Sequence, residues 1–120
     1  MVNGNVIVDK SMEFAVRTVK LYKYLSSSKE ENVMSKQLLR SGTSIGANVK
    51  EAVYGQSKKD FIAKMSIGLK EAVESEYWLE LLFRTEYLMQ EEFESMQSDC
   101  SEIAKMLTRI IKTAKESNVN

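Results

Sequence analysis

The sequence predicts an all-α protein, an up-down-up-down antiparallel four-helix bundle formed by a single domain over residues 1–120. The chain has no proline, and its five glycines are too few to supply the turns of an all-β fold. Apolar residues recur at spacings of three and four in four separate stretches, which is the period of an amphipathic helix. A chain of 120 residues with 43% hydrophobic residues suits one domain with a modest core.

The first helix is expected over residues 10–27, after a flexible tail at residues 1–8. Its core face is predicted to carry Met12, Ala15, Val16, Val19, Tyr22 and Leu25. Phe14 and Leu21 lie beside that face. The apolar run Val6 to Val8 is too short for a strand, and we expect it to cover a bundle end or a neighbouring subunit.

The second helix is expected over residues 29–54, because Ser28 followed by Glu31 has the form of a capping box. Its core spacing selects Val33, Met34, Leu38, Ile45, Val49 and Val53. Small residues interrupt this helix at Ser41, Gly42, Ser44, Gly46 and Ala47. Each glycine inside a helix costs about 1 kcal/mol relative to alanine. Close approach of a neighbouring helix would offset that cost.

A short turn is expected to join the second helix to a third over residues 58–84. Gly55 is predicted to take the left-handed conformation that closes a helix, and Ser57 with Asp60 forms another capping box. Residues whose numbers sum to about 112 should then lie level in an antiparallel hairpin. This rule places Gly42 near Leu69 and Gly46 near Met65.

The same rule predicts an ionic group in which Arg40 lies near Glu71, with Glu74 one helical turn further. The core row of the third helix reads Phe61, Met65, Leu69, Ala72, Glu76, Leu79 and Phe83. Glu76 is unusual in that row. We interpret it as an edge carboxylate that reaches solvent or pairs with Arg40 or Arg84; the alternative is a buried functional carboxylate.

The fourth helix is expected over residues 90–116, after a connection at residues 85–88. Glu91, Glu92 and Glu94 suit the positive end of its dipole. Its seam is predicted to contain Phe93, Met96, Cys100, Ile103, Leu107, Ile110 and Ala114.

Lysine plus arginine and aspartate plus glutamate are equal at 17 each, which argues against whole-surface attraction to nucleic acid or membrane. The predicted topology nevertheless gathers basic residues at one end of the bundle. They are Lys10, Lys50, Lys58, Lys59, Lys64, Arg109, Lys112 and Lys115. This end is interpreted either as a solvated face with scattered partners or as a surface that meets phosphate or an acidic partner.

The residue types favour a protein without enzymatic activity. Without histidine the chain lacks the usual general base near neutral pH, a Ser-His or Cys-His pair and the ligands of a di-iron bundle. Cys100 is expected in the core, and Trp78 is expected to anchor the core or an interface. We therefore expect no cofactor, metal or small-molecule substrate. A single cysteine and no apolar leader favour the cytoplasm, and no apolar run is long enough to span a membrane.

The segments SKQLLRSGTSIGANVKEA (35–52) and SKKDFIAKMSIGLKEAVESEYWLELL (57–82) resemble the four helix bundle protein family. The founding members of that family are encoded in intervening sequences of bacterial 23S rRNA genes. The positions that carry the resemblance are Leu39, Arg40, Ser44, Ile45, Asn48, Glu51, Ala52, Asp60, Phe61 and residues 71–78, which include Glu71, Glu74 and Trp78.

The resemblance implies an up-down bundle that commonly assembles as a ring-like homopentamer. Some relatives are accessory proteins of diversity-generating retroelements that bind reverse transcriptase and nucleic acid through a basic surface. The zero net charge of this chain departs from those strongly basic proteins.

Assembly is also predicted from a surplus of apolar residues, which one four-helix core is not expected to bury. The predicted interface residues are Phe14, Leu21, Ile62, Ile67, Val73 and Tyr77. We therefore expect a homo-oligomeric interaction module, preferably a pentamer, that recruits a protein or nucleic-acid partner. The alternative is an RNA- or DNA-binding protein that uses the basic end of each bundle and is associated with ribosomes or retroelements.

Overall fold

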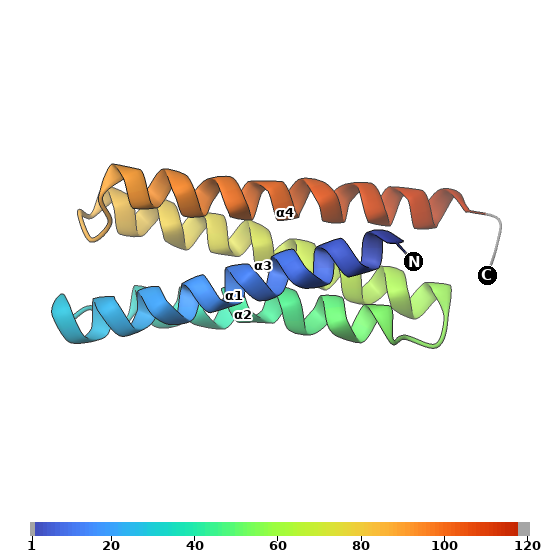
Figure 1. The fold of residues 1–120 in the computed structure, drawn as a ribbon, viewed down its shortest axis with the longest axis horizontal. Helices are drawn as coiled ribbons and strands as arrows, with labels where there is room; N and C mark the ends of the chain where they lie inside the picture. Colours follow the sequence, from blue (N-terminus) through green and yellow to red (C-terminus); the bar gives the residue numbers. More distant parts are fainter. Residues whose placement is uncertain (1, 118–120) are drawn as a thin grey trace.

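The structure is a computed structural model that describes the backbone of residues 2–117 and the side chains of residues 6–117. Within that range the chain forms four α-helices: α1 (Val2–Ser28), α2 (Met34–Val53), α3 (Lys58–Arg84) and α4 (Gln90–Glu116). They run alternately up and down along a molecule of 50 × 20 × 19 Å (Figure 1). The predicted all-α four-helix fold is confirmed.

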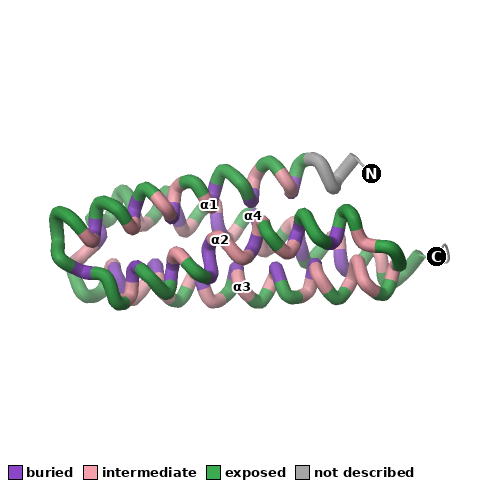
Figure 2. Tube along the Cα trace, turned by 90° about the horizontal axis from the view of Figure 1, so that it is seen from below, coloured by how far each residue is buried: buried purple, intermediate pink, exposed green. Residues whose placement is uncertain are grey.

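The helices are arranged in chain order around a common core, with buried residues on the inward side of each helix (Figure 2). The α2–α3 contact is the most extensive, followed by α1–α2 and α3–α4, and the α1–α4 contact is the least extensive. The diagonal pairs α1–α3 and α2–α4 are not adjacent in the described part of the chain. Figure 1 shows α1 and α4 diverging toward the end that holds the α3–α4 connection.

The first helix begins earlier than expected and buries a different face. The predicted tail is wrong for residues 2–8, which are helical, while Met1 lies outside the described residues. Ile7 is completely buried, one heptad before Phe14, and so it belongs to the core rather than to a neighbouring subunit. The buried face of α1 consists of Ile7, Ser11, Phe14, Thr18, Leu21 and Leu25. Met12 and Val16, which were assigned to the core, are exposed.

The predicted start of the second helix is also wrong, because Ser28 ends α1 and α2 begins at Met34. The carboxylate of Glu31 accepts hydrogen bonds from the backbone N–H groups of Val33, Met34 and Ser35 at 3.0, 2.9 and 2.9 Å. An anion at this position satisfies the free donors of the first turn and suits the positive end of the helix dipole. Glu31 therefore caps α2 alone, without the predicted serine.

The turn between α2 and α3 confirms one predicted cap and corrects the other. The Ser57 hydroxyl accepts a hydrogen bond from the N–H of Asp60 at 3.0 Å and caps α3. Gly55 does not adopt the left-handed conformation. Glycine suits this position because a Cβ there would lie 2.5 Å from Asp60 Oδ2. The positive φ angles within the described residues belong to Glu30 and Glu86, which lie two residues beyond the ends of α1 and α3.

The core residues of α2 and α4 also differ in part from the predicted rows. Val33 and Val53 are exposed, and α2 instead buries Ser35, Leu38, Ser41, Gly42, Ile45, Val49 and Ala52. In α4 the buried row ends at Ile111, while Ile110 is half-buried beside it. The helix bounds predicted for residues 58–84 and 90–116 agree with α3 and α4.

A layer of small side chains crosses the middle of the bundle, and we call it the small-residue layer. It consists of Ser11, Thr18, Ser41, Gly42, Gly46, Gly68 and Ser75. Its hydroxyl groups are satisfied locally or across helices; Ser41 and Ser75, for example, share a hydrogen bond of 2.8 Å between their Oγ atoms. Polar groups buried in this way avoid the cost of a lost hydrogen bond.

The glycines of α2 face α1, which corrects the prediction that they lie against α3. A Cβ built on Gly42 would lie 2.5 Å from Thr18 Cγ2, and one built on Gly46 would lie 3.4 Å from the backbone oxygen of Ser11. Gly68 provides the corresponding approach between α3 and α2, where an added Cβ would lie 3.6 Å from the backbone oxygen of Ile45. The expected close approach of helices is therefore present at two different interfaces.

The contact at Gly42 leads to a stability prediction. Gly42→Ala should lower the free energy of unfolding by about 1–3 kcal/mol, because the new methyl group overlaps the Thr18 side chain. Gly46→Ala should change it by less than about 1 kcal/mol, since its Cβ makes an ordinary contact and alanine favours the helix. Urea unfolding followed by circular dichroism measures both changes.

The matched control is Thr18→Ser, which removes Cγ2 but keeps the hydroxyl group that donates to the Ala15 carbonyl at 2.8 Å. In that background Gly42→Ala should cost clearly less than in the wild type. Equal costs in the two backgrounds would show that this contact does not limit the α1–α2 spacing.

The Glu31 cap leads to a prediction about pH. Burial raises the pKa of this carboxyl, but the hydrogen bonds from Met34, Ser35 and Val33 outweigh burial and leave the pKa below its ordinary value. A lowered pKa in the folded state gives stability that is present above the unfolded pKa of about 4.3 and is lost as the pH falls through the folded pKa. Glu31→Gln should therefore cost about 1–2 kcal/mol at pH 7 and less at pH 3.

Urea unfolding at the two pH values tests this expectation, with Glu30→Gln as the control because Glu30 is the neighbouring exposed carboxylate. The control should stay within about 0.5 kcal/mol of the wild type. A Glu31→Gln cost that is the same at pH 7 and pH 3 would rule out a charged cap.

Candidate partner-binding surfaces

The predicted ionic group is present at the middle of the α2–α3 contact. Arg40 Nη2 lies 2.6 Å from Glu74 Oε2 and 3.3 Å from Glu71 Oε1, and Trp78 Nε1 donates to Glu74 Oε2 at 2.9 Å. The Arg40 guanidinium, followed by the Trp78 indole, holds the pKa of Glu74 below its ordinary value. Both carboxylates therefore belong to a partly exposed ionic group that joins α2 to α3. Such partly solvated ion pairs add little stability but fix the register.

The other residues of the hairpin motif also make local structural contacts. Asn48 Nδ2 donates to the Ser44 carbonyl at 2.9 Å, and the Ser44 hydroxyl donates to the Arg40 carbonyl at 2.6 Å. Glu51 pairs with Lys64 at 3.0 Å, and Phe61 packs against the core. Among the described residues, no group of three or more acidic, cysteine or histidine side chains is placed to hold a metal ion.

Cys100 lies in the core of α4. Its side chain is completely buried, and its thiol donates a hydrogen bond to the Ala72 carbonyl at 3.2 Å. Burial, and then the charges of Glu76 and Asp99, raise the pKa of this thiol well above its ordinary value. The thiol therefore stays protonated, and the thiolate that a nucleophile requires does not form near neutral pH.

Glu76 is a half-buried carboxylate on the α4 side of α3. Burial raises its pKa above the ordinary value. Neither arginine that was expected to pair with it does so, because Arg40 contacts Glu71 and Glu74, and Arg84 pairs with Glu80 at 2.7 Å. No ion pair of Glu76 is found within residues 6–117.

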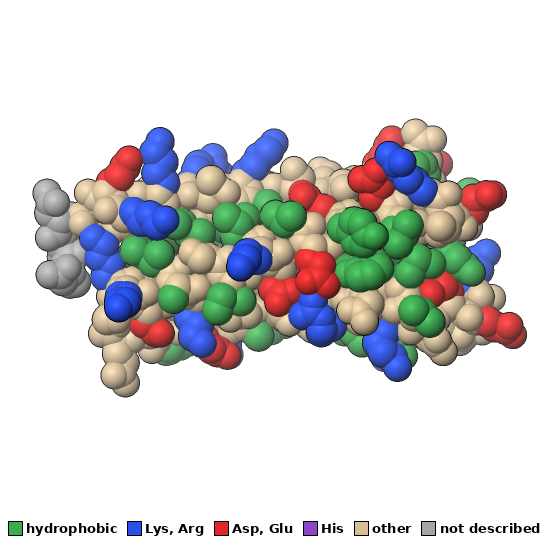
Figure 3. All heavy atoms as spheres, turned by 180° about the vertical axis from the view of Figure 1, so that it is seen from behind, with side chains coloured by type: hydrophobic (Ala, Val, Ile, Leu, Met, Phe, Trp, Pro, Cys, Tyr) green, Lys and Arg blue, Asp and Glu red, His purple; other side chains and the backbone are tan. Residues whose placement is uncertain are grey.

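The basic residues gather at the end of the bundle that holds the α2–α3 turn and the end of α4 (Figure 3). Lys10 pairs with Glu102 at 3.1 Å, Lys64 pairs with Glu51, and Lys58 donates a hydrogen bond to a backbone carbonyl at the end of α4. The remaining cations have no ion pair to any described residue and are exposed. We call them the basic-end group: Lys50, Lys59, Arg109, Lys112 and Lys115.

The residues predicted for a subunit interface divide into two sets. Phe14 and Leu21 are only 1% and 7% exposed and belong to the core, and Ile62 packs against it, so Phe14 offers no surface to a neighbour. Ile67, Val73 and Tyr77 are 41%, 55% and 58% exposed on α3, and we call them the α3 ridge. Figure 3 shows hydrophobic side chains gathered on the face of the molecule opposite α1.

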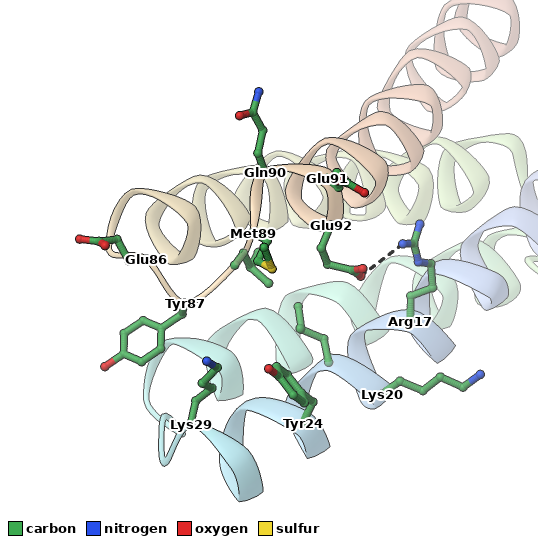
Figure 4. Close-up of a pocket in the computed structure, with 12 residues that line it drawn as sticks. Arg17, Lys20, Tyr24, Lys29, Glu86, Tyr87, Met89, Gln90, Glu91 and Glu92 are labelled. Carbon is green, nitrogen blue, oxygen red and sulfur yellow. Dashed lines mark hydrogen bonds and ion pairs between the residues drawn. The ribbon is translucent and has the colours of Figure 1, made fainter.

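Sequence reasoning missed a groove where α1 and α4 diverge. This α1–α4 groove has a volume of about 660 Å³, and its walls come from the second half of α1, the residue that follows α1, the α3–α4 connection and the first turn of α4 (Figure 4). The lining residues are Arg17, Lys20, Leu21, Tyr24, Lys29, Glu86, Tyr87, Leu88, Met89, Gln90, Glu91 and Glu92. The signal that was overlooked is the apolar pair Leu88-Met89 in a connection, where polar residues are usual.

Ion pairs close the α1–α4 contact where direct packing is sparse. Arg17 Nη1 lies 2.6 Å from Asp99 Oδ2, and Arg17 Nη2 lies 3.4 Å from Glu92 Oε2 at the inner edge of the groove. Beyond Arg17, Tyr24 is 49% exposed on one wall and Met89 is 81% exposed on the other. The groove therefore offers apolar side chains to a partner.

Comparisons with known proteins agree with this architecture. Residues 4–109 match the family model described as 23S rRNA-intervening sequence protein. The chain is also similar to a crystal structure from Bacteroides thetaiotaomicron, described as a protein with unknown function from the S23 ribosomal protein family. The two share 61% sequence identity, with a TM-score of 0.90, over 92% of this chain and 98% of that one. The comparison with curated proteins gives no match.

Proposed function

We propose that this chain, which belongs to the 23S rRNA-intervening sequence protein family, is a non-enzymatic homo-oligomeric interaction module. Its subunits associate through exposed apolar helix surfaces, and the assembly recruits a protein or nucleic-acid partner. The observation that carries this proposal is the exposure of Ile67, Val73 and Tyr77 on one helix of a bundle whose core is already filled. Exposed apolar surface of this kind is typical of contact sites in soluble proteins.

The residue chemistry supports a binding role over a catalytic one. The chain has no histidine, its single thiol is buried and protonated, and Glu71 and Glu74 are ion-paired with Arg40. A ring of five subunits is the preferred assembly, because the family resemblance implies it. The single cysteine fits a reducing compartment, so we place this function in the cytoplasm. No helix among the described residues is long and apolar enough to cross a membrane.

The basic-end group is the proposed recruitment surface. Its exposed side chains come from three helices and gather at one end of each bundle, so an oligomer would repeat them around a common axis. Repetition of a weak site raises the overall affinity without any new contact. The alternative function, RNA or DNA binding by this end, is favoured by the absence of ion pairs to these cations among the described residues.

Light scattering at micromolar concentration tests the assembly. The expected mass is several times the 13.7 kDa of one chain, and five times that mass would support the ring. A mass of one chain that is unchanged across concentration would contradict the proposal.

Titration with a labelled RNA of about 20 nucleotides then separates the two partner classes. Phosphate binding should weaken steeply as salt rises and should be lost in Lys59→Glu/Arg109→Glu/Lys112→Glu, while the opposite-end control Lys36→Glu binds normally. Absence of RNA binding, together with nuclease-resistant capture of a protein that the triple variant fails to retain, would favour the protein partner.

A further inference from the structure

We propose that the α1–α4 groove of one subunit receives the α3 ridge of a second copy of this chain, so that each subunit meets two neighbours through two different surfaces. This inference rests on the proposed oligomer and assigns its contact. The groove supplies Tyr24 and Met89, and the ridge supplies Val73 and Tyr77, all of them exposed in the single subunit.

The end of the ridge at Tyr77 overlaps in height with the part of the groove between Arg17 and Tyr24. Thr18 of α1 lies against Gly42 of α2, and the neighbouring Ser41 shares its hydrogen bond with Ser75 of α3, so these residues mark one level. Helices rise about 1.5 Å per residue. Tyr77 therefore lies about 3 Å beyond that level and Tyr24 about 9 Å beyond it in the same direction, while Val73 lies about 3 Å before it.

Equal height is what a closed ring requires. Rotation about one axis carries each subunit onto the next without translation along the axis, so surfaces that meet must lie level when the bundles run parallel to that axis. The two tyrosines differ in height by about 6 Å, and tyrosine side chains are long enough to span that difference. A ridge displaced by half the length of the bundle would instead produce an open helical filament.

The two surfaces also point in different directions. The groove opens between α1 and α4, while the ridge lies on α3, which is not adjacent to α1 in the described structure. A subunit can therefore fill the groove of one neighbour while its own groove receives the other. This head-to-tail arrangement differs from a two-fold dimer, in which one patch meets its own copy.

Charge at the rim agrees with this pairing. Lys20 extends outward from the rim of the groove and has no ion pair to a described residue (Figure 4). Glu76, beside the ridge, is half-buried without a cation. Both lie within about 3 Å of the level marked by Thr18 and Ser75, so a docked copy would bring the two charges together. An anion partly removed from water gains most from such a partner.

Mixing two complementary variants tests the pairing. The groove variant is Tyr24→Asp/Met89→Asp, and the ridge variant is Val73→Asp/Tyr77→Asp. Each should sediment as a single chain of 13.7 kDa at concentrations where the wild type is oligomeric. An equimolar mixture should form a pair of twice that mass, because the ridge of the groove variant fits the intact groove of the ridge variant and the ring cannot close.

The matched control is Val33→Asp/Tyr54→Asp, whose residues are 72% and 77% exposed and lie outside both surfaces. It should sediment like the wild type, and thermal melts should show that all three variants fold. If a double variant unfolds, the corresponding single variant, Tyr24→Asp or Tyr77→Asp, is used in its place.

Retention of the wild-type mass by the groove or the ridge variant would overturn the pairing. If the groove variant retains that mass, the groove would instead be a binding site for a helix of another protein. A mixture that stays at the mass of one chain would also overturn it. A wild type that is itself a single chain would instead contradict the oligomer on which the inference rests.

Discussion

The contact between Thr18 of α1 and Gly42 of α2 is the constraint on which the rest of the bundle depends. A glycine there lets the Thr18 side chain lie where a Cβ would otherwise be, and Ser11 lies close to Gly46 one to two turns away, where a Cβ would make an ordinary contact. The hydroxyl groups of Ser11 and Thr18 donate to carbonyls on their own helix, at 3.1 and 2.8 Å. Their burial therefore leaves no unsatisfied donor. Large side chains such as Phe14 and Leu25 then fill the core around this close approach.

Fixing α1 against α2 has a consequence on the opposite side of α1. Its contact with α4 is less extensive and is bridged by Lys10–Glu102 and by Arg17 with Asp99 and Glu92. The helices diverge beyond Arg17, where the α3–α4 connection places Met89 opposite Tyr24. The groove and the α3 ridge thus leave apolar side chains exposed outside the core, among them Tyr24, Met89 and Tyr77.

Periodicity and cap chemistry predicted α3, α4, the Ser57 cap and the Arg40 ionic group, because each depends on neighbours in sequence or on one short hairpin. The face of α1 was wrong because Ser11 and Thr18 are polar residues at core positions, and hydrophobicity alone shifts the stripe toward Met12 and Val16. Gly42 was recognised as a site of close approach, but the sequence does not say which helix approaches it. The groove depends on helix divergence, a tertiary property with no local pattern beyond Leu88-Met89.

Amide hydrogen exchange in about 0.05 M and about 1 M NaCl tests most directly whether packing against α2, rather than ion pairing with α4, holds α1 in place. High salt screens the exposed ion pairs and leaves the small-residue layer intact. The expected result is that amides of residues 11–18 exchange as slowly as those of residues 41–49 at both salt concentrations. Exchange in α1 that becomes much faster than in α2 at about 1 M NaCl would contradict this account, because it would show that the ion pairs hold α1 to the bundle.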